Sequence, residues 1–191
     1  AALKPGGQIL IAIENRTGFK YLAGASEDHL NVPNIGLLDY PEPLSGEITR
    51  GIRTWSKRQW HEMLQAFGFA NYEFCYPFPD YKVPDAIISD HFLMMNKHPE
   101  QVLGGIASRD YFATWQPRLG ESLFWRTAAQ TGSLDEFSNS FLIVLGDSME
   151  GVRQTIDFDF VRFASMMRKP KYRMQVLKKR DENVVRREPL T

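Results

Sequence analysis

The side chains of this sequence that are best suited to chemistry lie in two places. One is the polar stretch at residues 14–18, and the other is a carboxylate–imidazole pair at residues 28–29. Glu14 follows an apolar run, and Asp28 directly precedes His29. An imidazole titrates near neutral pH and a carboxylate can orient it, so His29 is a candidate general base with Asp28 as its partner. Glu14 is the third candidate catalytic residue. The alternative is that Asp28 and His29 form a solvated loop pair and that Glu14 pairs locally.

Candidate substrate-binding residues lie close to these positions in the sequence. Asn15 and Arg16 could orient a hydroxyl or an acidic group of a ligand, or they could pair within their own loop. Lys20 and Tyr21 could line the same pocket, although Tyr21 could equally pack beneath the loop.

The turn at residues 79–82 could face the same cleft. Tyr81 could stack on the face of a sugar ring, with Asp80 and Lys82 beside it, although aromatic residues in turns more often fill a core. No metal-ligand spacing links the other histidines, so no metal site is predicted. These histidines are His61, His91 and His98.

The sequence before the polar stretch predicts the strand that must position it. Residues 8–13 (Gln-Ile-Leu-Ile-Ala-Ile) form a continuous apolar run after a Pro-Gly-Gly turn at residues 5–7. Such a run is typical of a central strand of a parallel sheet that is covered on both faces. Open α/β folds bind ligands just beyond the carboxyl ends of these strands, where the polar stretch lies. Residues 18–53 follow without clear periodicity, which predicts a functional lid or insertion.

The clearest helix begins after Ser56, which forms a capping box with Gln59. Its predicted apolar face consists of Trp60, Met63, Leu64 and Phe67, with Gly68 at the C′ position. Strands are expected at residues 71–78, 84–89, 141–145 and 158–163, a hairpin at 172–177 and 184–187, and mainly helical structure at 99–132.

The composition is that of an ordinary globular chain. Of the 191 residues, 43% are hydrophobic and 24% are charged, and 23 basic residues balance 23 acidic ones. This balance gives no support to a nucleic-acid partner, and no apolar run approaches the roughly 20 residues of a membrane span. Cys75 is the only cysteine, which excludes an internal disulfide and favours a cytoplasmic location. Residues 168–187 are rich in basic side chains, which favours a solvated face over an anion-binding tail.

The segment Leu3-Lys4-Pro5-Gly6-Gly7, followed by an apolar strand, a polar loop, a capped helix and two strands, carries a resemblance to a known family. This order resembles the C-terminal part of class I S-adenosylmethionine-dependent methyltransferases, from the stretch before the fifth strand onward. The similarity covers about residues 1–90 and, more loosely, residues 137–145. Further segments resemble a bacterial subgroup associated with cell-surface polysaccharide synthesis. They are Ile13-Glu14-Asn15-Arg16, Lys20-Tyr21-Leu22-Ala23-Gly24-Ala25, Glu27-Asp28-His29, Arg53-Thr54-Trp55-Ser56 and Tyr76-Pro77-Phe78-Pro79-Asp80-Tyr81-Lys82.

The resemblance implies an α/β fold in three parts. Residues 1–90 would form the C-terminal half of a Rossmann-like methyltransferase domain, and residues 91–150 a mainly helical extension with one strand. Residues 151–191 would begin a further module or form a basic β-hairpin tail.

The resemblance also implies an activity and a cofactor. The full-length protein would use S-adenosylmethionine to O-methylate a sugar, a glycan or another small molecule. The family's glycine-rich cofactor loop and its ribose-binding acidic residue have no counterpart in this sequence, so no cofactor-binding residue is expected here. The chain alone is therefore expected to be inactive. We also expect a homo-oligomer, or another chain segment that completes the sheet beside residues 8–13.

Two other functions fit the sequence. The chain could be a non-catalytic interaction module that docks a partner through its sheet, its aromatic helices after Pro99 and its basic tail. It could also be part of a glycosyltransferase-type enzyme of surface polysaccharide synthesis, whose catalytic domain begins near Gly151.

Overall fold

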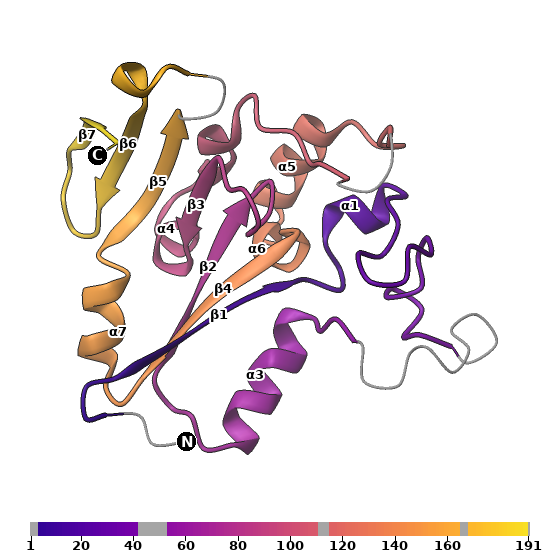
Figure 1. Ribbon diagram of the computed structural model, residues 1–191, viewed down its shortest axis with the longest axis horizontal. Coiled ribbons are helices and arrows are strands. Elements are labelled where there is room, and N and C mark those ends of the chain that lie inside the picture. The colour runs from indigo at the N-terminus through magenta and orange to yellow at the C-terminus, as the bar shows by residue number, and fades with distance from the viewer. Residues whose placement is uncertain (1–3, 42–52, 111–114, 165–167, 191) are drawn as a thin grey trace.

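The computed structural model has a mixed α/β fold built on one seven-stranded sheet (Figure 1). It describes residues 4–41, 53–110, 115–164 and 168–190. The strand order is β1-β4-β2-β3-β5-β6-β7, and neighbouring strands are antiparallel. The strands are β1 Gln8–Glu14, β2 Tyr72–Phe78, β3 Ala86–Ser89, β4 Ser140–Gly146, β5 Phe158–Ala164, β6 Met174–Lys179 and β7 Val185–Pro189.

Helices cover both faces of the sheet. They are α1 Phe19–Leu22, α3 Lys57–Ala66, α4 Asp90–Met95, η2 Pro99–Leu103, α5 Glu121–Gln130, α6 Leu134–Phe137, α7 Met149–Thr155 and η3 Pro170–Tyr172. Successive strand residues point to opposite faces. Ile143 of β4 packs in the main core with residues of α3 to α6, whereas Val144 packs with Val152 of α7 on the other face. No helix among the described residues is long and apolar enough to cross a membrane.

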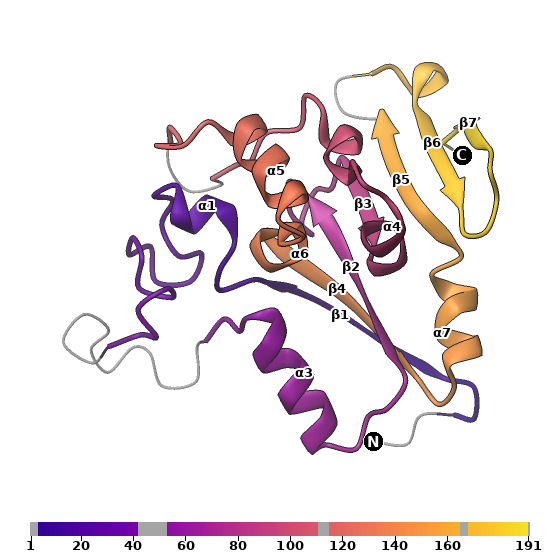
Figure 2. The same cartoon turned by 180° about the vertical axis from the view of Figure 1, so that it is seen from behind.

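The two ends of the sheet differ in their surroundings. Figure 2 shows β5, β6 and β7 at one side of the molecule and α1 with the loop after it at the other, as does the view from the front. The pairing of β3 with β5 makes the last three strands part of the same sheet as β1 to β4. That residues 151–191 begin a further module remains a prediction.

The first strand is not the covered central strand of a parallel sheet that the sequence predicted. Within the described residues, β1 lies at the sheet edge and pairs antiparallel with β4 alone. Ile9 and Ile11 pack against the main core, whereas Leu10 on the opposite face is 58% exposed. An apolar run does not specify the direction of its neighbours or how far a helix covers it. The α/β prediction is confirmed, but the Rossmann-like sheet is not, because the sheet is antiparallel.

The helix predicted after Ser56 is confirmed as α3. Ser56 accepts a hydrogen bond from the backbone of Gln59, whose side chain accepts one from the backbone of Ser56. Trp60 and Leu64 are buried as predicted. Phe67 is 75% exposed, because it lies at the C-cap, beyond the turns that face the sheet.

The remaining strand predictions are confirmed as β2 to β7, and Cys75 is buried as expected. The helical prediction for residues 99–132 is confirmed only in part. η2 and α5 lie within it, but residues 104–110 and 115–120 form no helix. The Pro and Gly residues in this stretch favour turns, and its aromatic side chains do not by themselves specify a helix.

Candidate functional site

The turn after β1 is fixed to the segment before β4. Asn15 is fully buried, and its amide nitrogen donates hydrogen bonds to the carbonyl oxygens of Glu136 at 2.8 Å and Ser138 at 2.7 Å. Its side-chain oxygen accepts a hydrogen bond from the backbone of Thr17 at 3.1 Å. The side chain of Asn15 therefore holds the loop, and the structure gives it no free group for a ligand.

Asn139 connects the start of α1 to the turn between β2 and β3. Its side-chain oxygen accepts a hydrogen bond from the backbone nitrogen of Lys20 at 2.8 Å, and its amide donates to the carbonyl of Pro79 at 2.8 Å. Asn139 is fully buried. No role was predicted for Asn139 from the sequence, where its only local signal is the polar Ser-Asn-Ser run that leads into a buried strand.

These supports bring together five side chains that we call the lysine–carboxylate cluster: Glu14, Lys20, Asp28, Tyr81 and Lys82. The Nζ atom of Lys20 lies 2.8 and 2.9 Å from the two carboxylate oxygens of Asp28. The Nζ atom of Lys82 lies 2.6 Å from Asp28 Oδ2 and 2.6 Å from Glu14 Oε1. The hydroxyl of Tyr81 donates to Glu14 Oε1 at 3.0 Å. The cluster thus lies at the carboxyl end of β1, where the sequence predicted a site.

Burial makes the charges of the cluster interact strongly. The side chains of Lys20, Glu14 and Asp28 are 2%, 5% and 9% exposed, whereas that of Lys82 is 31% exposed. Burial alone would raise the pKa of Asp28, but the charges and hydrogen bonds of Lys20 and Lys82 outweigh burial and hold this pKa below its usual value. Burial alone would lower the pKa of Lys82, but Asp28 and Glu14 raise it. Asp28 is therefore ionised and Lys82 protonated at neutral pH.

Tyr21 packs against the cluster. It is 3% exposed, and its hydroxyl has no hydrogen-bond partner among the described residues. Burial raises the pKa of Tyr21 strongly, and the charges of Asp28, Glu14 and Glu27 raise it further, so the phenol stays neutral and keeps its proton. An unpaired buried hydroxyl is unfavourable by about 1–3 kcal/mol. Tyr21 therefore keeps an unpaired, buried donor near the carboxylates of Asp28 and Glu14.

The expected hydrogen bond between Asp28 and His29 is not present in the described structure. The carboxylate of Asp28 faces the two lysines, and the side chain of His29 is exposed. The preceding Glu27 sets this geometry, because its buried Oε2 atom accepts the backbone hydrogens of His29 at 2.9 Å and Leu30 at 2.8 Å. A catalytic role for His29 remains a prediction.

Arg16 is engaged within the loops around the site. Its Nε atom donates to the carbonyl of Thr54 at 3.0 Å, and its Nη2 atom lies 2.9 Å from Asp39 Oδ1. The guanidinium carbon lies 5.9 Å from the centre of the Trp55 ring. Local pairing, which the sequence analysis left open for Arg16, is therefore what the structure has. Residues 42–52 of the predicted lid lie outside the described residues.

Four members of the cluster were predicted site residues, and Lys82 was expected only beside Tyr81 in a turn that could face the same cleft. Lys82 lies next to Tyr81 in the turn, yet its partners Asp28 and Glu14 are 54 and 68 residues away in the sequence. Residues so far apart in the sequence form no local sequence pattern that could predict their contact.

The turn after β1 does not form a cradle for a cofactor. A Cβ atom added to Gly18, the glycine of this turn, would lie 2.9 Å from the Cα atom of Asn139. The space beside Gly18 is therefore filled by the chain itself, and this turn leaves no open backbone for a bound group. Within the described residues, the cluster therefore offers hydrogen-bonding side chains, whereas the turn at Gly18 offers no cradle.

Comparison with known proteins identified no relative. No family model matches the chain, and neither the curated proteins nor the solved structures include one with significant similarity to it.

Proposed function

We propose that this chain is the C-terminal, acceptor-binding part of a class I S-adenosylmethionine-dependent methyltransferase. The observation that carries the proposal is the position of the lysine–carboxylate cluster at the carboxyl end of β1, within the strand order β1-β4-β2. β1 and β2 are both antiparallel to β4, so they run in the same direction on either side of it. The sheet of the family that the sequence resembles ends with this arrangement, one reversed strand between two strands of equal direction.

In this proposal, different residues hold the cofactor and the acceptor. S-adenosylmethionine, when bound, supplies the methyl group, and residues outside those described here would hold it. The cluster would hold the acceptor. The exposed side of Lys82 gives access to the cluster, where the hydroxyl of a sugar could donate to Glu14 or Asp28 and accept from Tyr21.

Acceptor binding would displace the ammonium group of Lys82 from the carboxylates that face the reacting hydroxyl of the acceptor. Lys82 bridges Glu14 and Asp28, so displacing it would free carboxylate oxygens to accept a proton from the acceptor. Lys20, which is almost fully buried, would keep Asp28 in place during this exchange. Glu14 and Asp28 are therefore the proposed acid–base residues, and an O-linked acceptor such as a sugar hydroxyl is the proposed substrate.

Location and assembly are part of the same proposal. The single cysteine is buried and cannot form an internal disulfide, which suits the reducing cytoplasm. The open edge of β1 would pair with another segment or another copy of the chain.

Transfer of a labelled methyl group to hydroxyl-bearing glycans, by the full-length protein that carries these residues, tests the proposed activity. Glu14→Gln should lower kcat/KM about a hundredfold, as expected for the loss of an acid–base group. Glu150→Gln is the matched control, because Glu150 is exposed on α7. Equal activity of the two variants would remove Glu14 from the proposed role, and no transfer to any hydroxyl acceptor would reject the activity.

A further inference from the structure

A groove lies on the α4 side of the sheet, between the segment α4–η2 and the strands β5 and β6. Its volume is about 560 Å³, which lies within the range of small-molecule sites. The rings of Phe92 and Phe160 form part of its lining, with their centres 5.2 Å apart in an edge-to-face arrangement. The groove therefore combines an aromatic surface with an open, polar rim.

The charged side chains that line the groove are all basic. The lining includes the cations Lys97, Arg162 and Lys178, together with His98, and no carboxylate. Asp159 lies behind it, 3% exposed, where it pairs with Lys178 and with His91 Nδ1 at 2.8 Å. This carboxylate neutralises one cation and leaves the charges of Lys97 and Arg162 for a ligand. Glu100 lies 3.5 Å from His98 and is outside the lining.

Arg162 is the best-placed anion-binding group in the groove. Its guanidinium donates to the carbonyl oxygens of Val102 at 3.0 Å and of Gly104. A guanidinium has five N–H donors, so three remain after these two bonds. No ion pair to a described residue balances its charge. The two carbonyls fix the position of the group without neutralising it.

We propose that this groove binds a small phosphorylated ligand with a flat ring, such as a nucleoside monophosphate. The phosphate would lie against Arg162, Lys97 and His98, because a phosphate accepts several charge-assisted hydrogen bonds at once. The ring would lie against Phe160. This site is separate from the lysine–carboxylate cluster, because β4, β2 and β3 lie between β1 and β5 in the sheet (Figure 1).

The test is a calorimetric titration of AMP and UMP into the 191-residue chain, with adenosine and uridine as the matched ligands without phosphate. At least one nucleotide should bind, and the nucleosides should bind at least tenfold more weakly. In amide spectra of the same samples, the signals of Val102, Phe160 and Lys178 should shift. Absence of binding by both nucleotides at millimolar concentration would overturn the proposal, as would equal binding of nucleotide and nucleoside.

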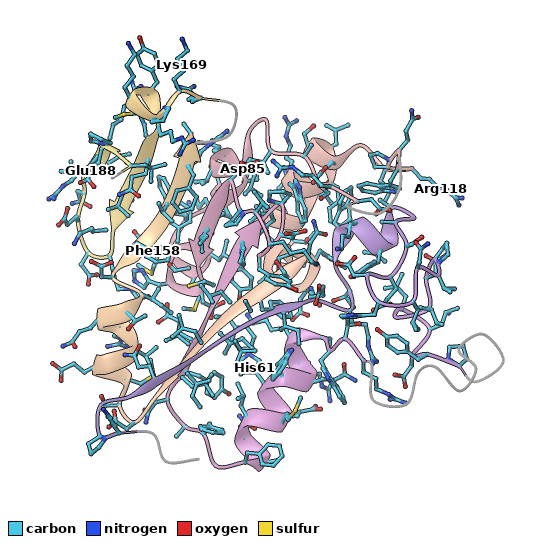
Figure 3. All side chains as sticks on the ribbon, in the orientation of Figure 1. His61, Asp85, Arg118, Phe158, Lys169 and Glu188 are labelled. Atoms are coloured by element: carbon cyan, nitrogen blue, oxygen red, sulfur yellow. The ribbon has the colours of Figure 1, made fainter. Side chains whose placement is uncertain are left out.

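A matched pair of variants distinguishes specific binding in the groove from non-specific attraction of anions to basic side chains. Lys97→Gln should weaken nucleotide binding about threefold to tenfold, the effect of one charge-assisted contact in an open groove. Lys169→Gln removes the same charge from the tip of the sheet at η3, where Figure 3 shows Lys169 beyond the ends of β5 and β6. It should leave binding unchanged. An equal loss in both variants would contradict a specific site.

Discussion

The ammonium group of Lys20 contacts both carboxylate oxygens of Asp28, at 2.8 and 2.9 Å, with almost no exposure to solvent. A buried ion pair is not by itself a stabilising feature, because desolvation of the two charges offsets their attraction. Removing one partner is nevertheless strongly destabilising, because the other charge then stays buried. Replacing Lys20 alone therefore tests whether the buried ion pair forms.

Lys20→Met should lower the free energy of unfolding by about 3 kcal/mol, because Asp28 then keeps Lys82 as its only cation in the cluster. Urea denaturation measures this value. Lys4→Met, at an exposed position, should change it by less than about 0.5 kcal/mol. A Lys20→Met protein as stable as the wild type would show that the pair does not form in solution.

Acid should weaken the fold in part through Asp28. The pKa of Asp28 is lower in the folded chain than its ordinary value near 3.8, so the unfolded chain takes up this proton first as the pH falls. The stabilisation is present above that ordinary value and is lost as the pH drops through the lower, folded pKa. The free energy of unfolding should therefore fall less between pH 5 and about pH 3 in Asp28→Asn than in the wild type. Parallel pH curves for the two proteins would contradict this.

Asn139→Ala should be among the most damaging polar substitutions at the site. It removes the hydrogen bonds with Lys20, Pro79 and Ser108 and leaves the buried backbone groups of Lys20 and Pro79 unpaired, which should cost about 2–4 kcal/mol of stability. Asn71→Ala is the control, because Asn71 makes one exposed hydrogen bond to Asp147, and its loss should cost less than about 1 kcal/mol. Similar losses in thermal or urea unfolding would show that Asn139 does not anchor α1.

One edge of β1 pairs with no other described strand, which should make the isolated chain self-associate or dissolve poorly. Sedimentation velocity should show dimers or larger species, and Leu10→Lys should shift the population toward monomer, because a charge on an edge strand opposes pairing. Leu123→Lys alters a similarly exposed leucine on α5 and should have no such effect. A wild-type monomer with a cooperative, high melting transition would contradict this prediction.

Local signals in the sequence predicted much of the fold. The capping box of Ser56 and Gln59 depends on residues three apart, and the β2–β3 pair depends on two apolar segments around one turn. The edge position of β1 could not be predicted in this way, because its partner β4 begins at residue 140. Nothing in residues 8–13 indicates that this partner is antiparallel.

The position of the lysine–carboxylate cluster was predictable in part. Glu14 lies beyond an apolar strand, as the polar stretch predicted, and Lys20, Asp28 and Tyr81 lie with it in the cluster. The pairing of Asp28 with lysines rather than with His29 depends on the backbone that Glu27 holds, so sequence neighbours were a poor guide to contacts.

The most direct test of the proposed function is calorimetric titration of S-adenosylhomocysteine into the 191-residue chain and, in parallel, into the full-length protein that carries it. We predict binding by the full-length protein and none by the chain, since we propose that the residues that hold the cofactor lie outside the chain. Tight binding by the chain would contradict this division of labour, and no binding by either would contradict the methyltransferase proposal itself.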